Sequence, residues 1–97
     1  MEKFNTEIIN KYSEFFRALS HPVRLEMALV LLESKEGMNV SEIQAQVKVS
    51  QSSVSQHLRI LKQAGLLSSN RSGTMVVYNY GSEEAKNIVE YIKTLKK

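Results

Sequence analysis

Apolar side chains recur every three or four residues over residues 4–19, which predicts a first helix with a strongly apolar face. This face holds more aromatic surface than a peripheral helix needs. Its members are Phe4, Ile8, Tyr12, Phe15, Phe16 and Leu19. Pro22 disfavours helical geometry at the residue before it and suits a first helical turn, so a second helix is expected over residues 22–34. Its inward residues are expected to be Val23, Met27, Val30 and Leu31.

Two shorter helices are predicted next. Gly37 is expected to close the second helix, and the S-x-x-Q pattern of Ser41 and Gln44 predicts a capping box that starts a third helix at Ser41. After a turn at residues 48–50, Ser50 can cap a fourth helix, which Gly65 is expected to end because glycine readily adopts the left-handed conformation. The inward residues of this fourth helix are expected to be Val54, Leu58 and Leu61.

The C-terminal third of the chain predicts a hairpin followed by a helix. Residues 66–69 and 74–80 have strand character, and the turn-rich residues 70–73 are expected to join them. Ser82 can cap a last helix, whose apolar stripe is Ile88, Ile92 and Leu95. Charges suit the dipole of this helix, with Glu83 and Glu84 at its start and Lys93, Lys96 and Lys97 at its end. The fold class expected is mainly α with a small β-hairpin, as a single domain over residues 1–97.

Charge placement indicates a function. The chain of 97 residues has a formal net charge of only +3, but residues 43–82 contain no Asp or Glu. The same stretch contains Lys48, Arg59, Lys62 and Arg71, and it covers the predicted helix, turn, helix and hairpin. An uncompensated basic surface on an element that can enter a groove indicates DNA binding.

The fourth helix supplies side chains suited to reading bases. Helical spacing places Gln51, Ser52, Ser55, Gln56 and Arg59 opposite its inward stripe, and Gln, Ser and Arg pair well with base edges or phosphates. An ordinary solvated face would be richer in Glu and Lys. Both a packed ring and a phosphate contact remain open for His57, and Arg71 at the hairpin tip is either a groove contact or a free surface residue. The expected DNA contacts are Ser50, Gln51, Ser52, Ser53, Ser55, Gln56, His57, Arg59, Lys62, Arg71 and Ser72.

Three segments, residues 18–25, residues 49–67 and the hairpin end at Val77 and Tyr78, resemble the ArsR/SmtB-type winged helix-turn-helix repressors. This resemblance covers nearly the whole chain. It implies a homodimer, joined by the first and last helices, that reads an inverted repeat in double-stranded DNA. The dimer contacts it implies are Phe4, Ile8, Tyr12, Phe15, Ile88, Ile92 and Leu95. These stripes also exceed what so short a monomer can cover, although an intramolecular pair closing a monomeric core is the alternative.

Other classes of function find little support in the sequence. The chain has no Cys and only two His, so the cysteine and histidine metal sites of many ArsR/SmtB-type repressors are not expected, nor is a cofactor. No nucleophile motif or phosphate-binding loop indicates an enzyme. Without an apolar run of membrane length or a signal peptide, a cytoplasmic protein is expected. The effector is left open between a small molecule, a partner protein and the repressor's own level. The alternative function is a protein-interaction module that uses Tyr78, Tyr80 and Tyr91.

Overall fold

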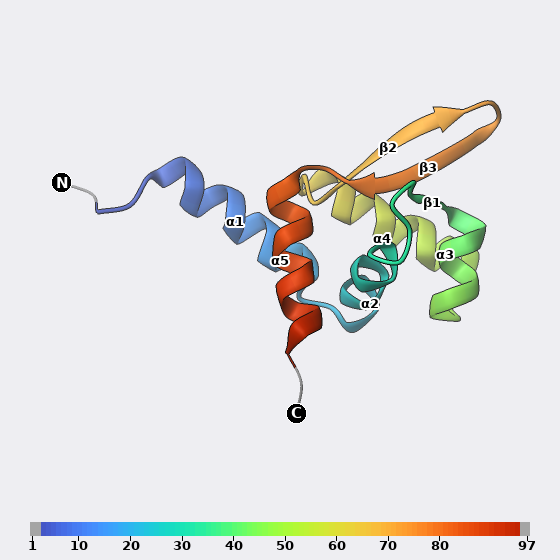
Figure 1. Cartoon of the computed structure of the whole chain (residues 1–97), viewed down its shortest axis with the longest axis horizontal. Coiled ribbons are helices and arrows are strands. Elements are labelled where there is room, and N and C mark those ends of the chain that lie inside the picture. The colour runs from blue at the N-terminus through green and yellow to red at the C-terminus, as the bar shows by residue number, and fades with distance from the viewer. Residues whose placement is uncertain (1–2, 96–97) are drawn as a thin grey trace.

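The computed structural model describes residues 3–95, which form five helices and a small sheet (Figure 1). In Figure 1 the first part of α1 extends away from the body of the molecule, and α5 crosses near the C-terminal end of α1. The overall extents are 49 × 36 × 23 Å. The elements are α1 (Thr6–Leu19), α2 (Pro22–Leu31), β1 (Met38–Asn39), α3 (Val40–Val47), α4 (Gln51–Gln63), β2 (Leu67–Ser72), β3 (Met75–Tyr80) and α5 (Glu83–Thr94).

The core lies among α2, α3 and α4, and α1 and α5 cover it from one side. Each helix contributes its apolar stripe, so the packing follows from the periodicity of the sequence. Phe15 is the largest side chain that α1 contributes, and α5 contributes Ala85 and Val89. The largest fully buried side chains are Phe15, Met27, Leu31, Ile43, Leu58, Leu61, Leu66, Val54 and Val89.

The second helix ends earlier than its sequence pattern suggests. α2 stops at Leu31 rather than at residue 34, because the amides of residues 33 and 34 bond to carbonyls three residues back, as in a tighter turn. Gly37 does not close a helix. It has φ +90° and lies directly before β1, where a Cβ atom would come within 2.6 Å of the Tyr78 carbonyl oxygen. The glycine is therefore required by the close approach of two backbone segments.

The capping box of α3 lies two residues before the predicted one. Asn39 accepts from the Glu42 amide at 2.9 Å, and the Asn39 amide donates to the Glu42 carboxylate at 2.9 Å. The helix consequently begins at Val40, and the Ser41 and Gln44 pairing predicted from the sequence is wrong. The caps predicted at Ser50 and Ser82 are confirmed, as is the left-handed Gly65 that follows α4.

The hairpin is longer than predicted and belongs to a three-stranded antiparallel sheet in the order β1-β3-β2. Ser72 pairs with Met75, so residues 70–72 lie in β2 and only Gly73 and Thr74 form the turn. The missed strand β1 is two residues long and pairs Met38 with Tyr78. This pairing joins the hairpin base to the start of α3, so the hairpin and α3–α4 form one connected unit.

The C-terminal helix matches its predicted charge pattern where it can be checked. Glu83 and Glu84 lie in its first turn and Lys93 in its last, whereas Lys96 and Lys97 fall outside the described residues. Across residues 3–95, none of the helices combines the length and the apolar character that crossing a membrane requires.

Candidate nucleic-acid interface

The turn between α3 and α4 is fixed by local hydrogen bonds. Lys48 ends α3 in the left-handed conformation at φ 60°, which is uncommon for a residue other than glycine. The Gln44 side-chain amide donates to the Val49 carbonyl at 3.1 Å, and the Ser53 amide donates to Ser50 Oγ at 3.2 Å. These contacts set the direction in which α4 leaves α3.

α4 has one buried face and one exposed face. Val54, Leu58 and Leu61 are each 0% exposed, so the predicted inward stripe is confirmed. The opposite face presents short or uncharged polar side chains and one arginine to solvent. Its exposed members are Gln51, Ser52, Ser55, Gln56 and Arg59, while Ser53 is half-buried. This polar face is therefore open to solvent from Gln51 to Arg59.

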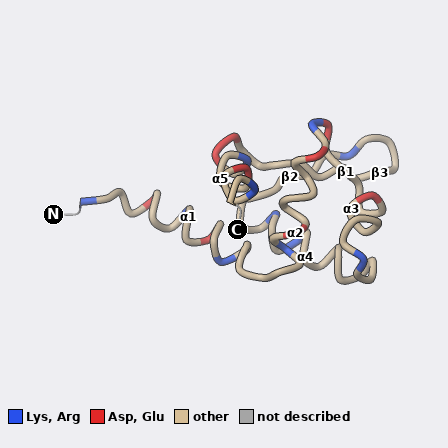
Figure 2. Tube along the Cα trace, turned by 60° about the horizontal axis from the view of Figure 1, so that its bottom comes forward, with Lys and Arg blue, Asp and Glu red and all other residues tan. Residues whose placement is uncertain are grey.

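The basic residues near this face are not neutralised by carboxylates. Within residues 3–95, the only ion pair joins Arg17 and Glu14 on α1, so Lys48, Arg59 and Arg71 have no acidic partner there. Figure 2 shows the β2–β3 hairpin with a blue segment and no red one. Lys62 Nζ donates to Ser69 Oγ at 2.7 Å and so connects α4 to the hairpin.

Arg71 lies near the hairpin tip but not in the turn itself. It is exposed in β2 opposite Val76, one residue pair before the Ser72–Met75 pair that borders the turn. Placing it in a strand corrects the expectation that residues 70–73 are a loop. Arg71 and Ser72 are the last two residues of β2, and the β2–β3 hairpin extends beyond the body of the domain (Figure 1).

His57 lies at the edge of the exposed face of α4, and its side chain contacts the start of α2. Its ring centroid lies 4.6 Å from that of His21, and its Nδ1 lies 3.3 Å from Nη1 of Arg24. Arg24 also donates through Nε to the Ala18 carbonyl at 2.6 Å, and His21 Nδ1 accepts from the Val23 amide at 3.1 Å. Burial, followed by the charges of His21 and Arg24, lowers the pKa of His57. This histidine therefore packs against α2, in contact with His21 and Arg24.

Sequence patterns did not reveal the cluster of His21, Arg24 and His57. Arg24 and His57 are 33 positions apart, and periodicity describes one element at a time. The only available signal was that His21 precedes Pro22, a position that caps a helix.

The expected dimer contacts divide into buried and exposed residues. Phe15 is only 2% exposed and belongs to the monomer core. It therefore has almost no surface to contribute to the expected dimer interface. Tyr12, Ile88 and Ile92 are half-buried. The large apolar side chains exposed near α1 and α5 include three that were not among the expected dimer contacts, Ile9, Phe16 and Tyr91. The full set is Phe4, Ile8, Ile9, Phe16, Tyr91 and Leu95.

Part of this exposed apolar set borders a cavity of about 490 Å³ between α1 and α5. Its lining comes from Phe16 on α1 and from Ile88, Tyr91, Ile92 and Leu95 at α5. Apolar surface gathered in this way on a small chain marks an interaction site. As for metals, no group of three His, Asp or Glu side chains suited to an ion occurs between residues 3 and 95.

Comparison with known proteins agrees with this geometry. Residues 21–69 match the sequence profile described as "Bacterial regulatory protein, arsR family". The transcriptional repressor SmtB of Mycobacterium tuberculosis is 41% identical over 86% of this chain, which spans 60% of the length of SmtB. The transcriptional repressor PagR of Bacillus anthracis aligns with a TM-score of 0.83 at 27% identity, over 91% of this chain and 99% of PagR.

The same fold occurs in a homodimeric winged helix-turn-helix DNA-binding domain of Mycobacterium bovis. That structure aligns with a TM-score of 0.82 at 20% identity, over 96% of this chain and 87% of the M. bovis chain. At this identity the likeness concerns the fold. In winged helix-turn-helix terms, α3 and α4 are the helix-turn-helix and the β2–β3 hairpin is the wing.

Proposed function

Because the chain belongs to the arsR family of bacterial regulatory proteins, we propose that it is a homodimeric repressor that reads an inverted repeat in double-stranded DNA. The observation that carries this proposal is the exposed polar face of α4 within a stretch that has basic residues and no acidic ones. Relatives named as transcriptional repressors support the direction of regulation. The activity involves no catalysis and takes place in the cytoplasm.

The recognition helix in this proposal is α4, lying in the major groove. Gln51 and Gln56 can each form two hydrogen bonds with adenine, and Arg59 can pair with guanine or a phosphate. The N-terminal half of α4, with Ser50, Ser52, Ser53 and Ser55, offers hydroxyl groups to base edges and to the backbone. Lys62 lies in the last turn, and in this proposal it contacts a phosphate.

The wing in this proposal contacts the DNA beside the recognition helix. Arg71 and Ser72 lie on the extended part of the hairpin, and positive charge is favoured in a narrow minor groove or along phosphates. The link between Lys62 and Ser69 gives the wing and α4 a fixed relative position. We assign His57 to positioning α4 rather than to a direct contact, since its ring packs against His21 and Arg24.

We further propose that α1 and α5 form the dimer interface. Support comes from exposed apolar side chains: Phe4 just before α1, Ile8, Ile9 and Phe16 on α1, and Tyr91 and Leu95 at α5. A two-fold dimer carries two copies of α4, which suits half-sites about one helical turn of DNA, roughly 34 Å, apart. The M. bovis relative of the same fold is a homodimer.

Selection from random duplexes tests the proposal. The purified protein is incubated with the duplex pool in moderate salt and a chelator, and the retained DNA is sequenced. An enriched inverted repeat supports a dimeric reader that needs no metal. Retention without an enriched sequence, or no salt-dependent retention, contradicts sequence-specific binding and favours the protein-interaction module.

A single substitution tests the role of α4. Gln56→Ala is expected to weaken binding to the selected repeat by about 1 to 3 kcal/mol and to relax base preference at one position. Gln63→Ala, at the far end of the same helix, is the matched control and should leave base preference unchanged. Equal losses on the selected repeat and on random DNA would exclude a base contact by Gln56.

A further inference from the structure

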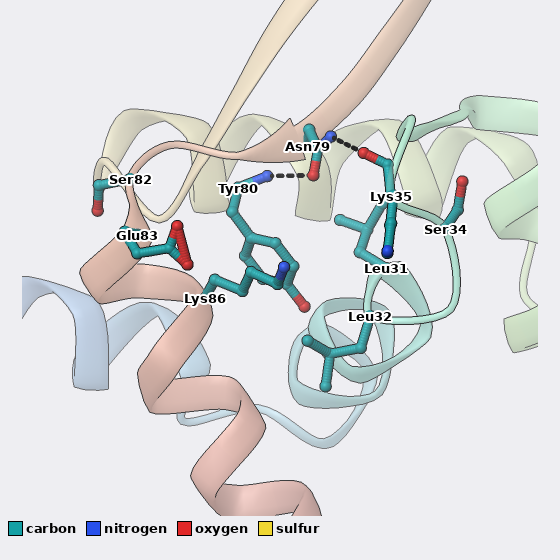
Figure 3. Close-up of a pocket in the computed structure, with 9 residues that line it drawn as sticks. All are labelled: Leu31, Leu32, Ser34, Lys35, Asn79, Tyr80, Ser82, Glu83 and Lys86. Atoms are coloured by element: carbon teal, nitrogen blue, oxygen red, sulfur yellow. Dashed lines mark hydrogen bonds between the residues drawn. The ribbon is translucent and has the colours of Figure 1, made fainter.

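A second cavity, separate from the DNA face and from the apolar α1–α5 surface, opens where the end of α2, the end of β3 and the start of α5 meet (Figure 3). Its volume is about 420 Å³, which falls within the range of small-molecule sites. The lining residues come from three segments far apart in the sequence. The position therefore depends on the folded arrangement of the hairpin and α5.

The floor of this cavity is apolar and held in place. Leu31 and Leu32 come from α2 and the turn after it, and the ring of Tyr80 comes from the end of β3. The Tyr80 hydroxyl donates to the Ala28 carbonyl, which fixes the ring against α2. Burial, and to a smaller extent the charge of Glu90, raises the pKa of Tyr80, so the phenol remains neutral.

Two lysines border this floor. In Figure 3, Lys35 stands to one side of Tyr80, and the side chain of Lys86 extends from α5 across the view of the Tyr80 ring. No described residue forms a hydrogen bond or an ion pair with either ammonium group. The backbone of Lys35 is anchored, because the Asn79 side-chain amide donates to its carbonyl at 3.1 Å. The cavity is thus bordered by two ammonium groups without a partner among the described residues, on backbone segments that the fold holds in place.

The charge balance of the cavity limits the ligands that suit it. Glu83, at the start of α5, also lines the cavity and offsets one of the two lysines. The remaining single positive charge complements a monoanion better than a multiply charged phosphate. Lys35 is exposed and Lys86 is half-buried, so both ammonium groups can be reached by a ligand that lies on the apolar floor.

We propose that this cavity binds a small organic monocarboxylate, with its apolar body on Leu31, Leu32 and Tyr80 and its carboxylate between Lys35 and Lys86. The ligand regulates DNA binding, a part of the inference that rests on the proposed function. The coupling follows from position. Lys35 lies in the turn before β1, where its carbonyl is bonded to Asn79 of β3, and Lys86 lies on α5. A ligand held by both lysines therefore connects β3, a strand of the wing, to α5, a helix of the proposed dimer, and limits the angle between these two elements.

The ligand site is tested on the free protein. Benzoate, phenylacetate and hexanoate, each paired with its uncharged amide, are titrated into ¹⁵N-labelled protein at pH 7. We expect amide shifts centred on residues 31–35, 79–80 and 83–86, saturating for at least one acid and at least about tenfold weaker for its amide. No saturable shift with any acid, or equal binding of acid and amide, overturns the site.

Lysine variants separate the site from general charge attraction. Lys35→Gln and Lys86→Gln should each weaken binding of the acid about tenfold, whereas Lys93→Gln, which removes the same charge at the far end of α5, should not. An equal loss in all three variants overturns the assigned site.

Regulation is tested with the selected DNA repeat. A saturating acid should change its affinity at least about threefold in the wild type and not in Lys86→Gln. Binding of the acid without such a change overturns the regulatory part. Because DNA binding without acid is measured in the same series, failure of the proposed repressor function appears separately, as absent DNA binding.

Discussion

Replacing Arg71 with Gln is expected to reduce the salt dependence of DNA binding by a calculable amount. Arg71 is exposed on the wing, and no carboxylate between residues 3 and 95 pairs with it. The acid-free stretch carries four basic residues, so a dimer presents about eight cations and the slope of log K against log salt should be about −7. Losing Arg71 from both protomers removes about two contacts and makes the slope shallower by about 1.8.

The same change predicts the loss of affinity at each salt concentration. Counterion release contributes less as salt approaches 1 M, so Arg71→Gln should weaken binding about 30-fold at 150 mM salt and about 200-fold at 50 mM. Fluorescence anisotropy with a labelled duplex, over this range of salt, measures both quantities. The selected repeat and a scrambled duplex should lose affinity by similar factors, because phosphates carry no sequence.

Lys93→Gln is the matched control for net charge. It removes one positive charge from the last turn of α5, outside the proposed DNA face, and should leave the slope unchanged. The reasoning is refuted if Arg71→Gln keeps the wild-type slope, or if both variants change it equally. A loss confined to the selected repeat would instead make Arg71 a base contact.

Four further predictions concern stability and assembly. Gly73 has φ +64° and open space around it, so Gly73→Ala should lower the free energy of unfolding, measured in urea, by about 1 kcal/mol. Gly37→Ala should lower it by ~2 kcal/mol more than Gly73→Ala does, because the added Cβ meets a carbonyl oxygen. The pKa of His57 is held below 6.5 by burial, His21 and Arg24, so stability present at neutral pH should fall as pH drops below 6.5, where the unfolded chain takes up the proton first. His57→Gln should remove this part of the pH dependence. Phe16→Glu should yield monomers in sedimentation, whereas Glu14→Gln, on the same exposed helix, should not.

Where the sequence predicted a helix correctly, the signals were local ones, an apolar stripe and a capping residue. Ser50, Ser82 and the inward face of α4 are where the periodicity placed them. The errors occur where the structure depends on contacts between distant segments. β1 has two residues, too few for a period, and exists because Met38 meets Tyr78. The earlier start of α3 follows from the same pairing, since Asn39 both ends the strand and caps the helix.

The candidate site shows the same division. The polar face of α4 and the missing acids could be read from the sequence alone. Two features could not, because they arise only when segments meet: the packing of His57 on α2 and the cavity bordered by Lys35 and Lys86. Phe15 and Phe16 are adjacent and chemically alike, yet one is 2% and the other 55% exposed. Helical spacing places both residues on the apolar face of the first helix, but only tertiary packing decides which of them enters the core.

The exposed half of α1 links assembly to DNA binding in the proposed dimer. None of residues 3–14 is buried, whereas Phe15, Ala18 and Leu19 anchor the helix to the core. A helix of 14 residues is marginal in water without packing, so its first turns need a partner to cover them. The second copy that covers them also fixes the distance between the two α4 helices. Dimer formation, order in α1 and binding to a spaced repeat should therefore respond together to protein concentration.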